Sequence, residues 1–94
     1  MLNKNNPQEE TATLVEETLS SGYCLLLYND DVNTFDHVIN SLVDICNHQL
    51  LQAEQCALLV HYAGKCVVKN GSYDSLEPMC TALLERGLSA KIEN

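Results

Sequence analysis

The chain has 94 residues, of which 46% are hydrophobic, so it can form one small domain with a modest core but not two domains. Thirteen acidic residues outnumber five basic ones and give a formal net charge of −8 at pH 7. This balance argues against binding to nucleic acids or to anionic membranes, because both need Lys and Arg on the protein. It suits a cationic partner group, such as an unblocked N-terminal ammonium.

The first residues contain no apolar core of a signal peptide, and no apolar run approaches the length of a membrane span. We therefore expect a cytoplasmic protein. Residues 1–21 are polar and acidic with few apolar side chains, a composition that predicts a disordered tail. A single core domain is expected over residues 22–94.

The first predicted strand covers residues 23–28, a continuous apolar run typical of a central strand that is buried on both faces. It ends at Asn29-Asp30-Asp31, three residues that favour turns. A helix follows, with Asn33 as the expected N-cap and Asp36 three residues later as a variant capping box. Its apolar side chains recur on one face, at Phe35, Val38, Ile39, Leu42 and Cys46.

A second helix is predicted over residues 51–63 and ends at Gly64. A short strand over 65–69 and a turn at Asn70-Gly71 lead to a third helix over 72–86. Pro78 is expected in or near the first turn of that helix, where a missing amide donor is tolerated. A last strand over 88–93 completes the order β-α-α-β-α-β, which predicts an α+β layer structure.

The five cysteines form no C-x-x-C pair, and three of them fall within apolar helical stripes. We expect buried, reduced thiols, with no metal and no cofactor. His37 and His48 are expected at the surface.

Two blocks of sequence carry the functional prediction. Leu27-Tyr28-Asn29-Asp30-Asp31 leads from the first strand into a helix, and Val60-His61-Tyr62-Ala63-Gly64-Lys65 ends the second helix about thirty residues later. In these blocks and in their separation the chain resembles the ClpS family, the adaptors that hand N-degron substrates to the Clp unfoldase–protease. The resemblance covers residues 22–93. It implies a three-stranded antiparallel sheet packed against three helices, a fold also found in the C-terminal domain of the ribosomal stalk protein.

The resemblance also implies a role for individual residues. Asn29, Asp30 and His61 would surround the α-ammonium of a substrate's first residue, and Asn33 would contact its first peptide unit. Asp74 would meet the N-terminal domain of a Clp AAA+ unfoldase of the ClpA or ClpC type. The chain itself would be a monomer without catalytic residues. The pocket for a first side chain of Leu, Phe, Tyr or Trp would be lined by Phe35, Val38, Ala57 and Val60.

The chemistry of such a site is reasonable on its own. An α-ammonium has three donors and no acceptor, and an Asn carbonyl, a carboxylate and a neutral His nitrogen supply converging acceptors. The chain departs from the family at Asn33-Thr34-Phe35, where the family usually has Thr-Pro-Met. Because Phe is larger and stiffer than Met, we expect a tighter or reshaped pocket. Met79 also replaces a family lysine near Asp74, which bears on docking to the unfoldase.

Three other functions are compatible with parts of the sequence. A metal or redox protein would use the cysteines and histidines, although paired ligand spacing is absent. A small hydrolase would need a Ser-His-Asp arrangement or a Gly-x-Ser-x-Gly elbow, and neither pattern is present. A regulator with the same fold could occupy the unfoldase without carrying cargo, an alternative that the retention of His61 with Asn29 and Asp30 disfavours.

Overall fold

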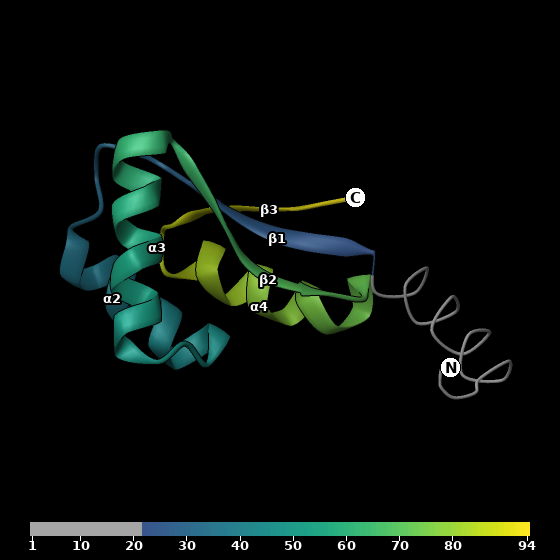
Figure 1. Ribbon diagram of the computed structural model, residues 1–94. Helices are drawn as coiled ribbons and strands as arrows, with labels where there is room; N and C mark the ends of the chain where they lie inside the picture. Colours follow the sequence, from purple (N-terminus) through teal and green to yellow (C-terminus); the bar gives the residue numbers. More distant parts are fainter. Residues whose placement is uncertain (1–21) are drawn as a thin grey trace, which may run out of the picture.

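The computed structural model describes residues 22–94, so the tail predicted for residues 1–21 lies outside the described part. The described residues form three strands and three helices in the predicted order β-α-α-β-α-β (Figure 1). The elements are β1 (Tyr23–Tyr28), α2 (Phe35–Cys46), α3 (Leu50–Ala63), β2 (Lys65–Gly71), α4 (Tyr73–Glu85) and β3 (Ser89–Glu93).

The strands form one antiparallel sheet with the order β2-β1-β3, so the continuous apolar strand β1 is central as predicted. Leu25 and Leu27 point into the core, and Leu26 is buried as well. The pairing of β1 with β2 shifts by one residue between Leu25 and Leu26, which leaves Val68 as the extra residue of a bulge.

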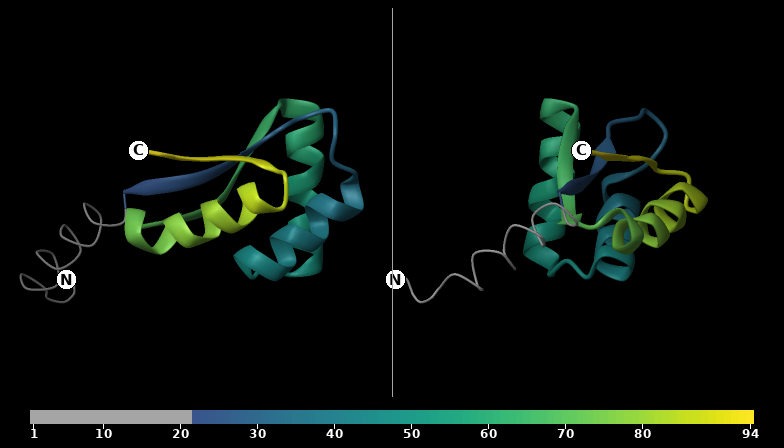
Figure 2. Two further views of the ribbon diagram at one scale, coloured as in Figure 1. Left: turned by 180° about the vertical axis from the view of Figure 1, so that it is seen from behind. Right: turned by 90° about the vertical axis from the view of Figure 1, so that its right-hand side faces the viewer.

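The helices make the second layer of the molecule (Figures 1 and 2). Helix α4 contacts all three strands, whereas α2 packs mainly against α3 and α4 and touches only β2 of the sheet. The core between the layers is mostly aliphatic with several cysteines, and its largest fully buried helical side chains are Leu42, Leu76 and Leu83. The α+β layer fold predicted from element order is therefore confirmed.

The N-cap of α2 differs from the prediction. Thr34 holds the cap position with an extended backbone, and its Oγ1 accepts a hydrogen bond from the His37 amide at 3.1 Å. Asn33 is a good capping residue by type, but its side chain is engaged with Asp30 and Gly87 instead. The expected Asn33–Asp36 capping box is therefore wrong.

Two further expectations are wrong. Pro78 lies in the second turn of α4 rather than the first, because Ser72 caps that helix and Tyr73 begins it. His48 is only 4% exposed, since the left-handed Asn47 (φ 58°) turns the chain inward after α2. Its Nε2 donates to the carbonyl of the bulged Val68 at 2.8 Å.

The cysteines are all free; Cys24 is half-buried, and the other four are buried as expected. Burial raises the pKa of the Cys46 thiol to about 11 and that of Cys56 to about 12. Across residues 22–94, no three His, Cys, Asp or Glu side chains converge in a way that could hold a metal ion. No helix in this part of the chain is long and apolar enough to cross a membrane.

Candidate functional site

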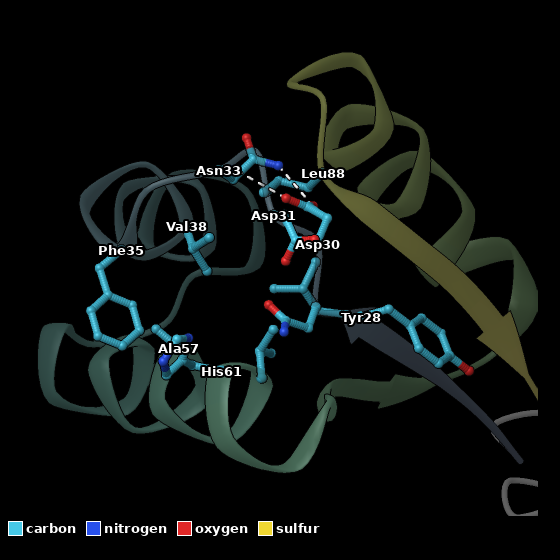
Figure 3. A pocket seen from close by; sticks show the side chains of 12 residues that line it. Tyr28, Asp30, Asp31, Asn33, Phe35, Val38, Ala57, His61 and Leu88 are labelled. Carbon is cyan, nitrogen blue, oxygen red and sulfur yellow. Dashed lines mark hydrogen bonds between the residues drawn. The ribbon is translucent and has the colours of Figure 1, made fainter.

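A pocket of about 270 Å³ opens where β1 ends, between the loop of residues 29–34, the first turns of α2 and the last turns of α3. Figure 3 shows Phe35, Ala57 and His61 along one wall, and Asp30, Asp31 and Leu88 across from them. The pocket brings together every residue predicted for substrate binding. Its lining includes Asn29, Asp30, Asn33, Phe35, Val38, Ala57, Val60 and His61.

The two sequence blocks meet because the sheet joins their ends. Tyr28, the last residue of β1, pairs with Lys65, the first residue of β2. One step further, the Asn29 amide donates to the Gly64 carbonyl at 2.9 Å. Gly64 adopts φ +93°, a conformation that favours glycine, and it ends α3 three residues after His61. This tie places Asn29 beside the final turn of α3.

Asp30 organises the loop through its carboxylate. Oδ1 accepts the amides of Val32 and Asn33, each at 2.9 Å, and Oδ2 accepts Asn33 Nδ2 at 2.8 Å. The Ser89 hydroxyl approaches Oδ2 at 3.5 Å. Burial alone would raise the pKa of Asp30, but these hydrogen bonds outweigh it and hold the pKa below its usual value. Asp30 is therefore ionised and already occupied by donors from the protein.

Asn33 connects the loop to the far end of the chain. Besides its bond to Asp30, its Nδ2 donates to the Gly87 carbonyl at 2.9 Å. Gly87 lies in the turn between α4 and β3 and adopts φ +83°. The loop is thus held at both Asp30 and Gly87, and Asn33 lies on the pocket wall between them.

The pocket has an apolar floor and a polar rim. Val38, Ala57, Val60 and Leu88 are all buried residues, and all four line the hollow. The rim is formed by more exposed side chains, among them Asn29 and His61. Such a site suits a ligand with one apolar end and one charged or hydrogen-bonding end.

The side chains of Asn29 and His61 take part in no hydrogen bond within residues 22–94, unlike those of Asp30 and Asn33. The His61 ring instead makes edge-to-face contacts with Phe35 (centroids 5.5 Å apart) and Tyr62 (4.7 Å). These contacts orient the imidazole while leaving its nitrogens available to a ligand.

Four lining residues were not predicted. Leu27 is a core residue below the floor, and Tyr28 points away from the pocket toward Glu93, to which its hydroxyl donates. Asp31 belongs to the first block without an assigned role, and its exposed carboxylate forms no hydrogen bond within the described chain. Leu88 lies in the turn just before β3. No local sequence pattern indicates that it lines the pocket, and only the fold places it beside the loop.

Asp74, the predicted contact to the unfoldase, lies elsewhere. It is exposed in the first turn of α4. The neighbouring Tyr73 packs edge-to-face on Tyr23 at 5.7 Å, beside the beginning of β1. Because the pocket lies at the other end of β1, Asp74 and the pocket occupy opposite ends of the sheet.

Comparison with known proteins gives a consistent result. Residues 18–91 match the family model described as ATP-dependent Clp protease adaptor protein ClpS. Proteins named ATP-dependent Clp protease adapter protein ClpS from Campylobacter jejuni, subspecies jejuni and doylei, are 40% identical over 57 residues. That alignment covers 58% of this chain and 59% of each relative's length, so the match spans somewhat over half of these relatives.

A solved structure has the same fold. Agrobacterium tumefaciens ClpS2, in a structure bound to L-phenylalaninamide, superimposes with a TM-score of 0.70 and 23% sequence identity. The superposition covers 76% of this chain and 93% of that one.

Proposed function

Because the chain belongs to the ClpS family of Clp protease adaptors, we propose that it binds proteins bearing a free, bulky hydrophobic N-terminal residue and delivers them to a Clp-type AAA+ unfoldase–protease. It has no catalytic step of its own. The observation that carries the proposal is the pocket with an apolar floor beneath a rim on which the side chains of Asn29 and His61 make no hydrogen bond to another described residue. A substrate's first side chain fills the floor, and its α-ammonium meets the rim.

Asn29 Oδ1 and a neutral nitrogen of His61 are the direct acceptors for the ammonium, since no other described residue hydrogen-bonds to either side chain. Asp30 supplies negative charge from within the loop, and Asp31 adds a second carboxylate on the pocket wall. Asn33 lies at the mouth and contacts the first peptide unit. An acetylated terminus loses the charge and leaves acceptors unpaired, so the site rejects it.

The expected affinity is moderate. Each charge-assisted hydrogen bond contributes about 1.5–3 kcal/mol, and burial of one Leu or Phe side chain adds about 1.5–3 kcal/mol. Association and ordering cost several kcal/mol, so the net binding free energy is well below the sum of these contributions. Such an adaptor can capture its cargo and also release it.

Phe35 shapes the choice of first residue. Phe35 is 44% exposed, and its ring is held against His61 on the pocket wall. A rigid aromatic ring in this place narrows the entrance more than a flexible Met does. We propose Leu, Phe, Tyr and Trp as ligands, with Trp the weakest; affinity for Trp equal to that for Leu would contradict a narrowed pocket.

Two further observations support the proposal. The ligand of the fold-level neighbour, L-phenylalaninamide, carries a free α-amine and an apolar side chain, the two groups that this pocket would hold. The exposed Asp74 lies at the opposite end of the sheet from the pocket, so an unfoldase of the ClpA or ClpC type can dock there while cargo is bound.

Fluorescence anisotropy tests the binding function. A labelled peptide that begins with Phe should bind wild-type protein, and its N-acetylated form should bind at least about tenfold more weakly. His61→Ala should lose about as much affinity for the free peptide. Leu59→Ala serves as the control, because Leu59 lies on the same helix as His61 but is 52% exposed and lies outside the pocket lining. Equal binding of free and acetylated peptides would rule out the proposal.

A further inference from the structure

Helix α3 has apolar side chains on two opposite faces. Ala53, Cys56, Ala57 and Val60 form the buried face. On the outer side, Leu51 is 67% exposed, Leu59 is 52% exposed and Tyr62 is 79% exposed. A surface helix normally keeps apolar residues on its buried face alone, and an exposed apolar surface with a polar border marks an interaction site.

A second hollow, of about 250 Å³, lies between α2 and α3 at the border of this outer face. It shares two walls, Phe35 and Ala57, with the first pocket. The ring of Phe35 therefore stands between two adjoining hollows rather than at the edge of one (Figure 3 shows its pocket side). The hollow is lined by Phe35, Ile39, Glu54, Gln55, Ala57 and Leu58.

We propose that this second hollow, which we call the third-residue subsite, receives the third side chain of the substrate's N-terminal segment and prefers Lys or Arg there. The inference rests on the proposed function, because the first residue must occupy the first pocket. In an extended chain the first and third side chains lie on the same side, about 7 Å apart, and the second points away. A chain that leaves over Phe35 thus directs its third side chain into the adjoining hollow.

The chemistry of the lining selects the side chain. Ile39 and Leu58 offer aliphatic surface to a long methylene stem. Glu54 is exposed on the rim, and neither ion pair found within residues 22–94 involves it. Lys and Arg combine an apolar stem with a cationic end that can remain partly hydrated, which fits both features. The net charge of −8 favours such a cationic peptide as well.

Two peptides of identical composition test the subsite: Phe-Gly-Arg followed by glycines, and Phe-Arg-Gly followed by the same glycines, both with a C-terminal fluorophore. Wild-type protein should bind the peptide with Arg in third place about fivefold more tightly, the scale of one partly screened ion pair with a packed stem. Glu54→Gln and Leu58→Ala should each reduce this preference to within about twofold.

Matched control variants exist outside the hollow. Leu59→Ala removes an exposed apolar side chain of α3 that does not line the hollow, and Glu85→Gln removes an exposed charge from α4. Both variants should keep the full preference. Loss of the preference in either control would overturn the assignment to Glu54 and Leu58.

The acetylated form of the first peptide separates the two proposals. Weak binding of the acetylated peptide combined with equal binding of the two free peptides would overturn the third-residue subsite and leave the proposed function standing. Equal binding of free and acetylated peptides would overturn both. Sedimentation of wild type and Leu58→Ala completes the test: a concentration-dependent dimer that Leu58→Ala abolishes would assign this face to a second copy of the chain and overturn the subsite.

Discussion

The two sides of the pocket are built in different ways. The loop of residues 29–34 is held by its own side chains, with Asp30 accepting from Val32, Asn33 and Ser89, and Asn33 reaching Gly87. The last turns of α3 are held by the regular helix, and the exposed His61 side chain makes no hydrogen bond to another described residue. The loop residues therefore combine architecture with the proposed recognition, whereas the His61 side chain is free to serve the proposed recognition alone. Substitutions on the two sides should separate stability from binding.

Asp30→Ala should have the largest effect, because it removes the acceptor of four donors at once. We expect a loss of about 2–4 kcal/mol in the free energy of unfolding, together with a loss of more than about tenfold in affinity for a Phe-initiated peptide. Urea denaturation and anisotropy measure the two effects.

Asp31→Ala is the control for that variant, since the Asp31 carboxylate is exposed and makes no hydrogen bond in the described part of the chain. It should leave the unfolding free energy within about 0.5 kcal/mol of wild type. If Asp30→Ala unfolded at the same urea concentration as Asp31→Ala, the architectural role of Asp30 would be wrong.

Asn29 and Asn33 offer the same comparison within one residue type. Asn29→Ala keeps the backbone bond to Gly64 and removes only the rim amide, so affinity should fall about tenfold while stability stays within about 0.5 kcal/mol. Asn33→Ala breaks the bonds to Asp30 and Gly87 and should lose about 1–2 kcal/mol of stability. The opposite pattern would exchange the roles that we assign to the two residues.

Much of the fold could be predicted because it depends on local periodicity. The apolar run of β1 and the capped, one-faced pattern of α2 specify element type before any partner is known. The cap itself could not be predicted, since Asn33 and Thr34 are both good caps by type. A contact to Gly87, 54 residues away, engages Asn33 elsewhere and leaves the cap to Thr34. His48 was misassigned for a similar reason, because its partner is a bulge in β2.

The residues of the candidate site likewise divide into those that the sequence could predict and those that only the fold reveals. Asn29, Asp30 and His61 could be placed together because the two blocks resemble those of a known family. In the structure, the hydrogen bond from the Asn29 amide to the Gly64 carbonyl holds the two blocks side by side. Leu88 could not be found, because the sheet alone brings it to the floor. The sequence also could not predict that Asp30 accepts hydrogen bonds from the loop, because a turn motif does not specify which of its carboxylates points inward.

Gly64 and Gly87 anchor the two sides of the pocket, and their replacement should reduce stability by a smaller amount. Gly64 and Gly87 have φ of +93° and +83°, and a Cβ on either would meet no atom within 4 Å. Replacement by Ala should therefore cost only backbone strain, about 1–2 kcal/mol for each variant, with peptide affinity kept within about twofold because the carbonyls still accept from Asn29 and Asn33. A much larger loss of stability or affinity on replacing one of the glycines would show that its side of the pocket tolerates backbone movement poorly.

The smallest expected effect is the pH dependence of the unfolding free energy that arises from the Asp30 carboxylate. Because the pKa of Asp30 is lowered in the folded protein, its ionised form stabilises the fold above its ordinary pKa of 3.8, and that stabilisation is lost as the pH falls through the lowered value. Asp30→Asn removes the charge at every pH. The difference in unfolding free energy that is due to this charge should therefore be about 0.5–1 kcal/mol at pH 7 and should shrink as the pH falls below 3.8. Urea denaturation at pH 7, 4 and 3 measures it, with Leu59→Ala as a variant whose difference should not depend on pH. A difference for Asp30→Asn that stayed constant into acid would mean that the loop is held by the geometry of its donors rather than by the charge that they surround.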